Sequence, residues 1–366
     1  MFRSAIEQMA PYLPGEQPRP GERLIKLNTN ENPYPPSPRV RRAIVQAAAA
    51  ETLRLYPRPR ADSLVAAAAR YYRLPGNMIV AGNGSDELLS MLFRASLDAG
   101  DVAAWAVPTY SLYDTLAAIA GARVVRIELG RDFSLPLQAL ARARARLTIV
   151  CNPNSPSGTL VGQEELTELA RRLRPRLLVI DEAYVDFADR SSLRLVRALD
   201  NVVILRTMSK SFSLAGMRLG LLLGSAPLVD QLLKVKDSYN LNCLAQAAGA
   251  AALNDAAWAL RNVERVRRTR RMTEAGLRKI GFEVPPSAAN FVLARLAGVK
   301  LEGMAAGLRR RGILVRYFDT PLLYDCLRIT IGKPAEMKIL LRELAPLAAA
   351  ARAGSGTRRS RARVHA

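Results

Sequence analysis

The segment 206–220 holds the residues best suited to chemistry, because a lysine stands there among hydroxyl groups and an arginine. Lys210 follows an apolar run that predicts a buried strand, and open α/β sheets bind ligands at the carboxyl ends of their strands. An amine in that position can bond to a carbonyl carbon and later move a proton. Thr207, Ser209 and Arg218 offer groups that suit a phosphate dianion. Taken alone, such a segment is more often a polar surface loop.

A second segment, 176–184, adds a carboxylate and a phenol. Its apolar run predicts a buried strand that ends at Asp181, whose carboxylate can pair with a protonated pyridine nitrogen and keep the ring an electron sink. Tyr184 can donate a hydrogen bond to an oxygen on the same ring. The alternative for Asp181 is a cap of the next helix.

Two further segments predict an anion site and a flat aromatic face. Gly84, Ser85 and Asp86 lie between a predicted strand and helix, where backbone N–H groups and the helix dipole can bind a phosphate. A capped helix start is the simpler explanation. Tyr110 follows another strand and can stack on a flat heterocycle, although an aromatic residue there more often serves packing. Together with Lys210, these parts match the aldehyde, ring and phosphate of pyridoxal phosphate.

The sequence lacks most of the residues and motifs that other classes of catalytic site require. The single histidine, His365, lies near the end of the chain, which argues against a Ser-His-Asp triad, a Cys-His pair and a histidine-built metal site. Cys151, Cys243 and Cys326 are far apart and form no C-x-x-C pair, so we expect buried thiols and no metal site. Neither the dinucleotide glycine motif nor the P-loop motif is complete.

The charge is the one unusual feature of the composition, with 54 Lys and Arg against 32 Asp and Glu. The net charge of +22 raises the hypothesis of a nucleic-acid-binding protein, but the arginines are spread through Ala/Arg-rich helices without a recognisable nucleic-acid motif. We interpret them as a solvated surface that also attracts anionic substrates, and expect no nucleic-acid partner. With no secretory signal and no apolar window of about 20 residues, we expect no membrane partner and a cytoplasmic location.

The elements that must position these residues follow from apolar strands alternating with helical segments, the pattern of a doubly wound, mostly parallel sheet. A length of 366 residues suits one large α/β domain and a smaller one. We expect residues 43–260 to form the large cofactor-binding domain, residues 1–42 and 261–350 the small α/β domain, and residues 351–366 a basic disordered tail. The predicted strands of the large sheet are 78–81, 102–107, 124–127, 147–151, 177–180, 202–206 and 219–224.

From about Leu27 to Leu347 the chain resembles fold-type I aminotransferases of the histidinol-phosphate aminotransferase group. The segments that carry the resemblance are 27–34, 55–57, 82–87, 108–110, 152–154 with 156–158, 181–184, 209–212, 214–216, Arg218 and 327–330. The resemblance implies the fold of type I pyridoxal-phosphate transferases. It also implies these roles: Lys210 as the Schiff-base lysine, Asp181 as the pyridine partner, Tyr184 as the ring-oxygen donor, Tyr110 as the ring stack, and Ser85, Asp86, Thr207, Ser209 and Arg218 around the cofactor phosphate.

The chain departs from the family pattern at one cofactor contact. Most relatives have an asparagine whose amide donates to the ring oxygen, where this chain has Ser155. A serine hydroxyl reaches less far, so we expect Asn154 or a water to substitute.

For the substrate, the resemblance implies an anion clamp and a shared site. Arg328 matches the arginine that binds the substrate carboxylate, and Arg316 looks like its second arm. Either arginine could instead be an exposed strand charge. Tyr34 and Asn290 are further candidates for substrate binding. Tyr56 resembles a tyrosine that reaches the partner's cofactor phosphate, which implies a homodimer.

The reaction implied by the resemblance is ping-pong transamination in histidine biosynthesis. L-histidinol phosphate would be the amino donor and 2-oxoglutarate the acceptor, giving imidazole-acetol phosphate and glutamate. Two alternatives share the cofactor motifs, namely an aromatic amino acid aminotransferase and a phosphate-recognising decarboxylase.

Overall fold

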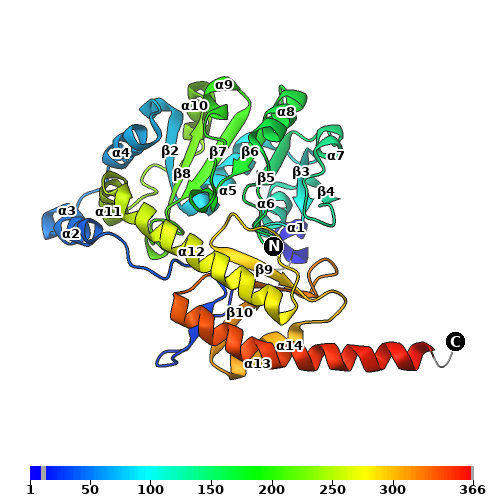
Figure 1. Cartoon of the computed structure of the whole chain (residues 1–366). Helices are drawn as coiled ribbons and strands as arrows, with labels where there is room; N and C mark the ends of the chain where they lie inside the picture. Colours follow the sequence, from blue (N-terminus) through cyan, green and yellow to red (C-terminus); the bar gives the residue numbers. More distant parts are fainter. Residues whose placement is uncertain (10–13, 364–366) are drawn as a thin grey trace.

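Two β-sheets organise the protein, whose computed structural model describes residues 1–9 and 14–363. Figure 1 shows the larger, seven-stranded sheet in the upper part of the molecule and the four-stranded sheet below it. Helix α12 (Ala256–Ile280) runs diagonally past both. Within the described residues, no helix is long and apolar enough to cross a membrane.

The large sheet is mostly parallel, as predicted. Its strand order is β2-β8-β7-β6-β5-β3-β4, and β8 pairs antiparallel with both of its neighbours. The predicted strands agree with the structure to within two residues. Their bounds are β2 Ile79–Asn83, β3 Val102–Val107, β4 Arg123–Glu128, β5 Leu147–Cys151, β6 Leu177–Asp181, β7 Val202–Thr207 and β8 Leu219–Gly224.

Both faces of this sheet are buried, which explains why its strands are continuous apolar runs. Along β6, Leu178 and Ile180 belong to one apolar cluster, whereas Val179 belongs to the other. Alternate side chains of a strand point to opposite faces, so these clusters are the two sides of one core. The first is completed by α4 (Asp62–Tyr72), α8 (Gln163–Leu173) and α11 (Cys243–Asn254), and the second by α5 (Gly84–Ser96), α6 (Leu112–Ala120) and α10 (Ala226–Lys234).

The small sheet joins the two ends of the chain. Its order is β1-β10-β11-β9, and β1 (Ile25–Leu27) runs parallel to β10 (Ile313–Tyr317). The other strands are β9 (Phe291–Arg295) and β11 (Cys326–Thr330). Beside β9, Glu283 forms a single antiparallel bridge to Arg295. A separate apolar cluster joins this sheet to α12, α13 (Glu302–Arg310) and α14 (Pro334–Arg363). The remaining α-helices are α1 Ser4–Gln8, α2 Pro38–Ala47, α3 Ala50–Leu53, α7 Leu137–Arg142 and α9 Leu195–Ala198.

The C-terminal segment differs from the expectation of disorder after residue 350. Helix α14 continues to Arg363, and residues 364–366 lie outside the described residues. The alanines and arginines of this segment are strong helix formers, whereas Gly354, Ser355 and Gly356 are not.

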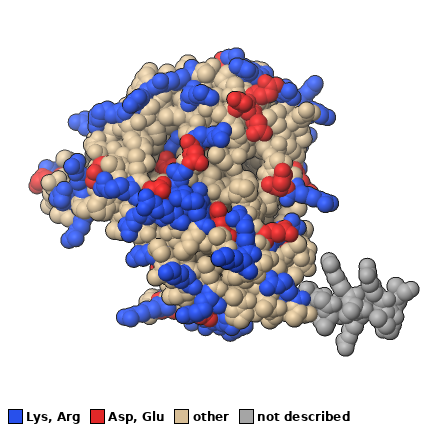
Figure 2. Space-filling view, in the orientation of Figure 1, with Lys and Arg blue, Asp and Glu red and all other residues tan. Residues whose placement is uncertain are grey.

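Basic residues cover much of the visible face, with a dense group over α12 (Figure 2). The sequence of α12 contains eight basic residues and two acidic ones. Part of this charge is balanced locally, because Glu264 lies within 4 Å of the guanidinium groups of Arg267, Arg268 and Arg271.

The start of α5 lies directly against β8, and glycine makes this contact possible. A Cβ atom at Gly220 would lie 2.5 Å from the carbonyl carbon of Gly84 and 2.6 Å from the nitrogen of Ser85. Because these are backbone atoms, the helix start would have to move.

We therefore expect Gly220→Ala to lower the free energy of unfolding by about 3 kcal/mol. Gly216→Ala is the matched control, since nothing lies within 4 Å of a Cβ there. The control should change stability by about 1 kcal/mol or less. Thermal and urea unfolding of the two variants test this, and equal stability would show that the close approach is not rigid.

Candidate active site

A cavity of about 700 Å³ lies where the carboxyl edge of the large sheet faces the small sheet. Parallel strands end at the same edge, so β7, β6, β5 and β3 deliver the residues that follow them to one place. Most of the predicted site residues line this cavity: Ser85, Asp86, Tyr110, Ser155, Asp181, Tyr184, Thr207, Ser209, Lys210, Arg218, Arg316 and Arg328.

Lys210 lies in the turn that follows β7. Its Nζ donates a hydrogen bond to the carbonyl of Thr29 at 3.2 Å and lies 5.7 Å from the ring centre of Tyr184. The amide of Asn32 donates to the carbonyls of Lys210 and Ser211, which holds the turn from the other lobe. Burial, with the charge of Arg328 second, lowers the pKa of Lys210 to about 8. A much larger fraction of the amine is therefore neutral and nucleophilic near neutral pH than in an ordinary lysine.

Asp181 ends β6 and is 3 % exposed. Its Oδ2 accepts a hydrogen bond from the Tyr113 hydroxyl at 2.7 Å, and its Oδ1 accepts one from the backbone N–H of Ala183. Burial raises the pKa of this carboxyl to about 6. No cation of the described chain lies within ion-pair distance of it, although it faces the cavity. A protonated ring nitrogen would supply that missing charge, so the site fits a pyridine ring.

A phosphate fits the other end of the same cavity. Gly84 has a φ of +81°, and a Cβ there would lie 2.7 Å from the Nη2 atom of Arg218. The Asn83 side chain makes no capping bond to α5, so the first N–H groups of that helix are not capped by it. Ser209 and Thr207 add hydroxyl groups 3.0 Å apart. These donors line the same cavity as the Arg218 guanidinium, which is held by Asp86 at 2.8 Å, and together they can bind one anion.

Two tyrosines flank the space between Asp181 and Lys210. The Tyr184 hydroxyl accepts a hydrogen bond from the Asn30 amide at 3.1 Å, which leaves its own hydrogen available for an acceptor in the cavity. Burial raises the pKa of Tyr184, so this group remains protonated. Tyr110 donates to Asp86 at 3.2 Å, and its ring packs edge-on against Tyr113.

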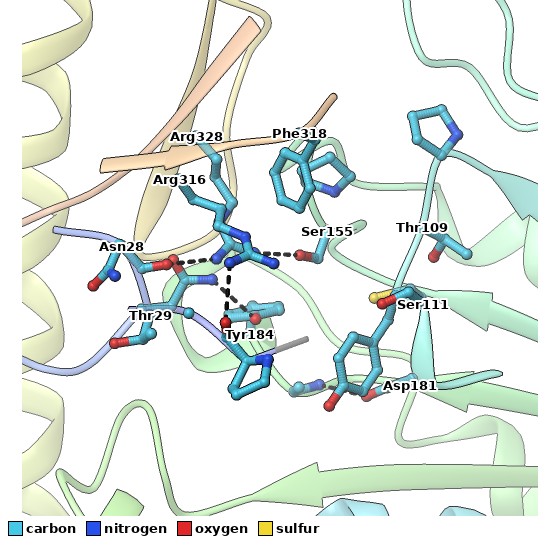
Figure 3. A pocket seen from close by; sticks show the side chains of 18 of the residues that line it. Asn28, Thr29, Thr109, Ser111, Ser155, Asp181, Tyr184, Arg316, Phe318 and Arg328 are labelled. Atoms are coloured by element: carbon cyan, nitrogen blue, oxygen red, sulfur yellow. Dashed lines mark hydrogen bonds between the residues drawn. The ribbon is translucent and has the colours of Figure 1, made fainter. Parts of the chain in front are cut away.

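The two arginines enter from the small sheet, as Figure 3 shows. Arg316 and Arg328 stand opposite each other on neighbouring antiparallel strands. Arg328 donates to the hydroxyl of Ser155 at 3.2 Å and to the carbonyl of Asn28 at 2.8 Å. Arg316 donates to the carbonyl of Pro14 at 3.3 Å. Both guanidinium groups lie within 5.5 Å of the Phe318 ring centre.

Some predicted residues lie outside the cavity lining. The Asn154 amide donates to the carbonyl of Pro108 and to the hydroxyl of Ser157, which are two loop contacts. Asn290 is buried and donates to the carbonyl of Asn30. Tyr34 is also buried, with the Arg265 guanidinium 3.6 Å from its ring centre. Gly84 acts through its backbone beside Arg218.

Tyr56 lies on the surface and is 80 % exposed. Its ring stacks on that of Tyr239, with centres 4.6 Å apart. In a single chain it therefore takes no part in the cavity lining.

Three residues that sequence reasoning missed support the site directly. Tyr113 lies on the apolar face of α6 and looks like an ordinary core residue, yet its hydroxyl binds Asp181. Thr29 and Asn30 lie in the segment 27–34, whose resemblance to the family was noted. Nothing in their spacing indicates that they would contact Lys210 and Tyr184, which are far away in sequence.

Comparisons with known proteins agree with this arrangement. A family model described as aminotransferase class I and II matches residues 22–344. Histidinol-phosphate aminotransferase 1 of Trichormus variabilis is 43 % identical over 94 % of this chain and 98 % of its own length. Histidinol-phosphate aminotransferase of Geobacter sp. (strain M21) is 46 % identical over 94 % and 99 %.

Solved structures are similar over nearly the whole chain. Histidinol-phosphate aminotransferase from Sinorhizobium meliloti, solved in complex with pyridoxal-5'-phosphate, has a TM-score of 0.86 and 27 % identity, covering 95 % of this chain and 98 % of that one. A Thermus thermophilus aspartate aminotransferase mutant, at 23 % identity and a TM-score of 0.82, covers 94 % of this chain and 99 % of its own and shares the fold. The chain therefore belongs to the class I and II aminotransferases and, within them, to the histidinol-phosphate aminotransferase group.

Proposed function

We propose that the protein is a pyridoxal-phosphate enzyme that transfers the amino group of L-histidinol phosphate to 2-oxoglutarate. The products are imidazole-acetol phosphate and glutamate, and the reaction is a step of histidine biosynthesis. The observation that carries the proposal is the placement of Lys210 between a phosphate cradle and a pair of arginines. Curated relatives of that name are 41–46 % identical over most of the chain. As a biosynthetic enzyme, it is expected in the cytoplasm.

When bound, pyridoxal phosphate supplies an aldehyde carbon that takes the amino group and a protonated ring that withdraws electrons from the bond being broken. Asp181 would hold the proton on the ring nitrogen, because the positive charge of a protonated ring stabilises a buried carboxylate that has no other cation beside it. The Tyr184 hydroxyl donates to the ring oxygen. Thr207, Ser209, Arg218 and the first turn of α5 bind the phosphate. The Ser155 hydroxyl accepts a hydrogen bond from Arg328. Its own hydrogen can therefore be donated to the ring oxygen or to a water.

Lys210 moves the substrate proton. Its Nζ would accept the proton from the substrate Cα and hold it for return to the cofactor's aldehyde carbon, on the other side of the transferred nitrogen, which requires an amine that starts out neutral. The lowered pKa of Lys210 meets this requirement near neutral pH. The amine hydrogen-bonds to a carbonyl and not to a carboxylate, so it lacks the ion pair that would hold it more firmly in the charged form.

Arg316 and Arg328 bind the anionic end of both substrates. The donor presents a phosphate and the acceptor a carboxylate, and a pair of planar guanidinium groups can donate hydrogen bonds to two oxygens of either anion. The chain offers the two groups from opposite positions of adjacent strands, so their spacing is set by the sheet.

An aromatic amino acid aminotransferase is the second candidate, since apolar side chains line part of the cavity. Phe318, Pro321, Leu322 and Leu323 come from the connection between β10 and β11. An aromatic side chain would bury apolar surface there.

We further propose a homodimer in which Tyr56 serves the partner's site. Two observations support this dimer: Tyr56 is exposed, and so are its apolar neighbours Leu53 and Leu55, since large exposed apolar side chains mark interfaces.

For the single chain we propose a large domain at residues 43–260 and a small domain at residues 1–42 and 261–350. The boundary on α12 is supported by Ala259 and Val263, which belong to different apolar clusters.

The function is tested by the visible absorption of the purified protein. We expect a band from bound pyridoxal phosphate that disappears on adding L-histidinol phosphate and returns on adding 2-oxoglutarate. Lys210→Ala, which removes the amine, should lose the band and the activity. Loss of the band with L-phenylalanine alone would favour the aromatic alternative, release of carbon dioxide would favour a decarboxylase, and no band in the wild type would contradict the assignment.

Arg328→Gln should weaken the binding of both substrates to a similar extent. Losing one charged arm costs about 3 kcal/mol, which corresponds to a roughly 100-fold higher KM for L-histidinol phosphate and for 2-oxoglutarate. Arg342→Gln, on an exposed face of α14, is the matched control and should leave both KM values unchanged. Steady-state kinetics measure the effect, and a change confined to one substrate would refute a shared clamp.

Hybrid dimers test the placement of Tyr56. A dimer of one Tyr56→Ala subunit and one Lys210→Ala subunit contains one site with Lys210 and the partner's Tyr56. If Tyr56 acts across the interface, this hybrid should have about half of the wild-type activity. If the hybrid is no more active than expected from the Tyr56→Ala dimer alone, Tyr56 acts within its own chain.

A further inference from the structure

A buried group of charges lies directly behind the cavity and takes no part in the proposed chemistry. At its centre is Arg206 of β7, which is 6 % exposed. Its guanidinium binds the carboxylate of Glu182 at 2.8 Å, that of Asp186 at 3.0 Å and the hydroxyl of Ser191 at 2.8 Å. We call these four residues the buried ionic cluster.

The cluster adjoins the site residues along the chain. Glu182 directly follows Asp181, and Arg206 directly precedes Thr207. Ser211 directly follows Lys210, and its hydroxyl donates a hydrogen bond to Asp186. Because Ser211 is 2 % exposed, no solvent competes for this bond.

Stability alone is a weak explanation for such a cluster. Taking charges out of water is costly, and well-packed apolar residues of similar size often stabilise a fold as much or more. A charged cluster does, however, fix directions that apolar contacts leave free, because hydrogen bonds to ionised groups are strong and directional. Among the side-chain hydrogen bonds of the described residues, the one that links the cluster to the turn of Lys210 runs from Ser211 to Asp186.

We propose that Asp186 is a positioning residue, which fixes the Lys210 turn through the Ser211 hydroxyl while Arg206 holds Asp186 in place. This inference rests on the proposed role of Lys210 as the lysine that bonds to the cofactor. With the turn fixed, the amine stays in the cavity against the carbonyl of Thr29. Without the Ser211 bond, the turn loses its link to the buried ionic cluster and keeps the bonds of Met208 and Ser209 to the adjoining strand ends and those from Asn32.

The basicity of Lys210 reports on this position, because burial is the main cause of its lowered pKa. An amine that moves towards water should regain basicity. The other groups that face Lys210 come from different elements and would remain in place. They are Arg328, Glu31, Asp86, Arg218 and the ring of Tyr184.

The experiment follows cofactor-free protein as it recombines with pyridoxal phosphate at a series of pH values. Only the neutral amine reacts, so the rate of wild-type recombination should rise with a midpoint near pH 8. We expect Ser211→Ala to raise this midpoint by about one pH unit and to slow recombination at pH 7.5 by roughly 10-fold. This readout does not depend on turnover.

Ser191→Ala is the matched control, since Ser191 binds Arg206 and Glu182 but does not touch the turn of Lys210. Its midpoint should equal that of the wild type. Equal midpoints in all three proteins, or equal shifts in both variants, would overturn the proposal.

Asp186→Asn provides a second variant should Ser211→Ala fail to fold. Its amide oxygen should turn to Arg206, leaving the NH₂ group towards Ser211, so the hydroxyl loses its acceptor and the midpoint rises again. A wild-type midpoint with Asp186→Asn would also refute the proposal. If wild-type protein gives no visible band at any pH, the proposed function fails instead, which separates the two failures.

Discussion

The site depends on keeping a carboxylate and an amine in one buried cavity without letting them pair with each other. Asp181 is held by the Tyr113 hydroxyl and a backbone N–H, and Lys210 by the carbonyl of Thr29. Burial therefore disfavours the charged form of both, raising the pKa of the acid and lowering that of the amine. This arrangement costs stability, and the extensive core on both faces of the large sheet offsets it.

Neither lobe contains the whole site. The large sheet supplies the amine, the carboxylate and the phosphate cradle from the ends of its strands. The small sheet supplies the arginines, and the chain after β1 contacts Lys210, Tyr184 and Arg328 through residues 28–32. The relative position of the lobes consequently sets how far the bound anion of the substrate lies from Lys210. Catalysis by orientation requires this distance to match the distance between the substrate's anion and its reacting carbon.

The sequence predicted the large sheet well because its strands are buried on both faces and their apolar runs have few alternative interpretations. It also predicted the residues at the strand ends, where short motifs carry the chemistry. Contacts between distant segments were not predictable: Tyr113 has the pattern of a core residue, and the link from Asn30 to Tyr184 depends on how the lobes meet. The same limit applies to Asn154, whose amide is occupied by Pro108 and Ser157. At the C-terminus, composition favoured disorder whereas helix propensity favoured α14, and single-sequence reasoning had no tertiary contact by which to choose.

The pKa of Lys210 is lowered mainly by burial and secondly by the charge of Arg328, and this order matters for catalysis. Arg328 lowers the pKa of the amine, but in the proposed function it also binds the substrate's anion, and a bound anion would cancel much of its charge. If Arg328 were the main cause, substrate binding would protonate the amine just when a base is needed. Burial is the larger cause, and a substrate that fills the cavity excludes water further. The two effects oppose each other, so the amine can remain weakly basic while the arginine is occupied. A single arginine can therefore bind the substrate beside the base without abolishing its function.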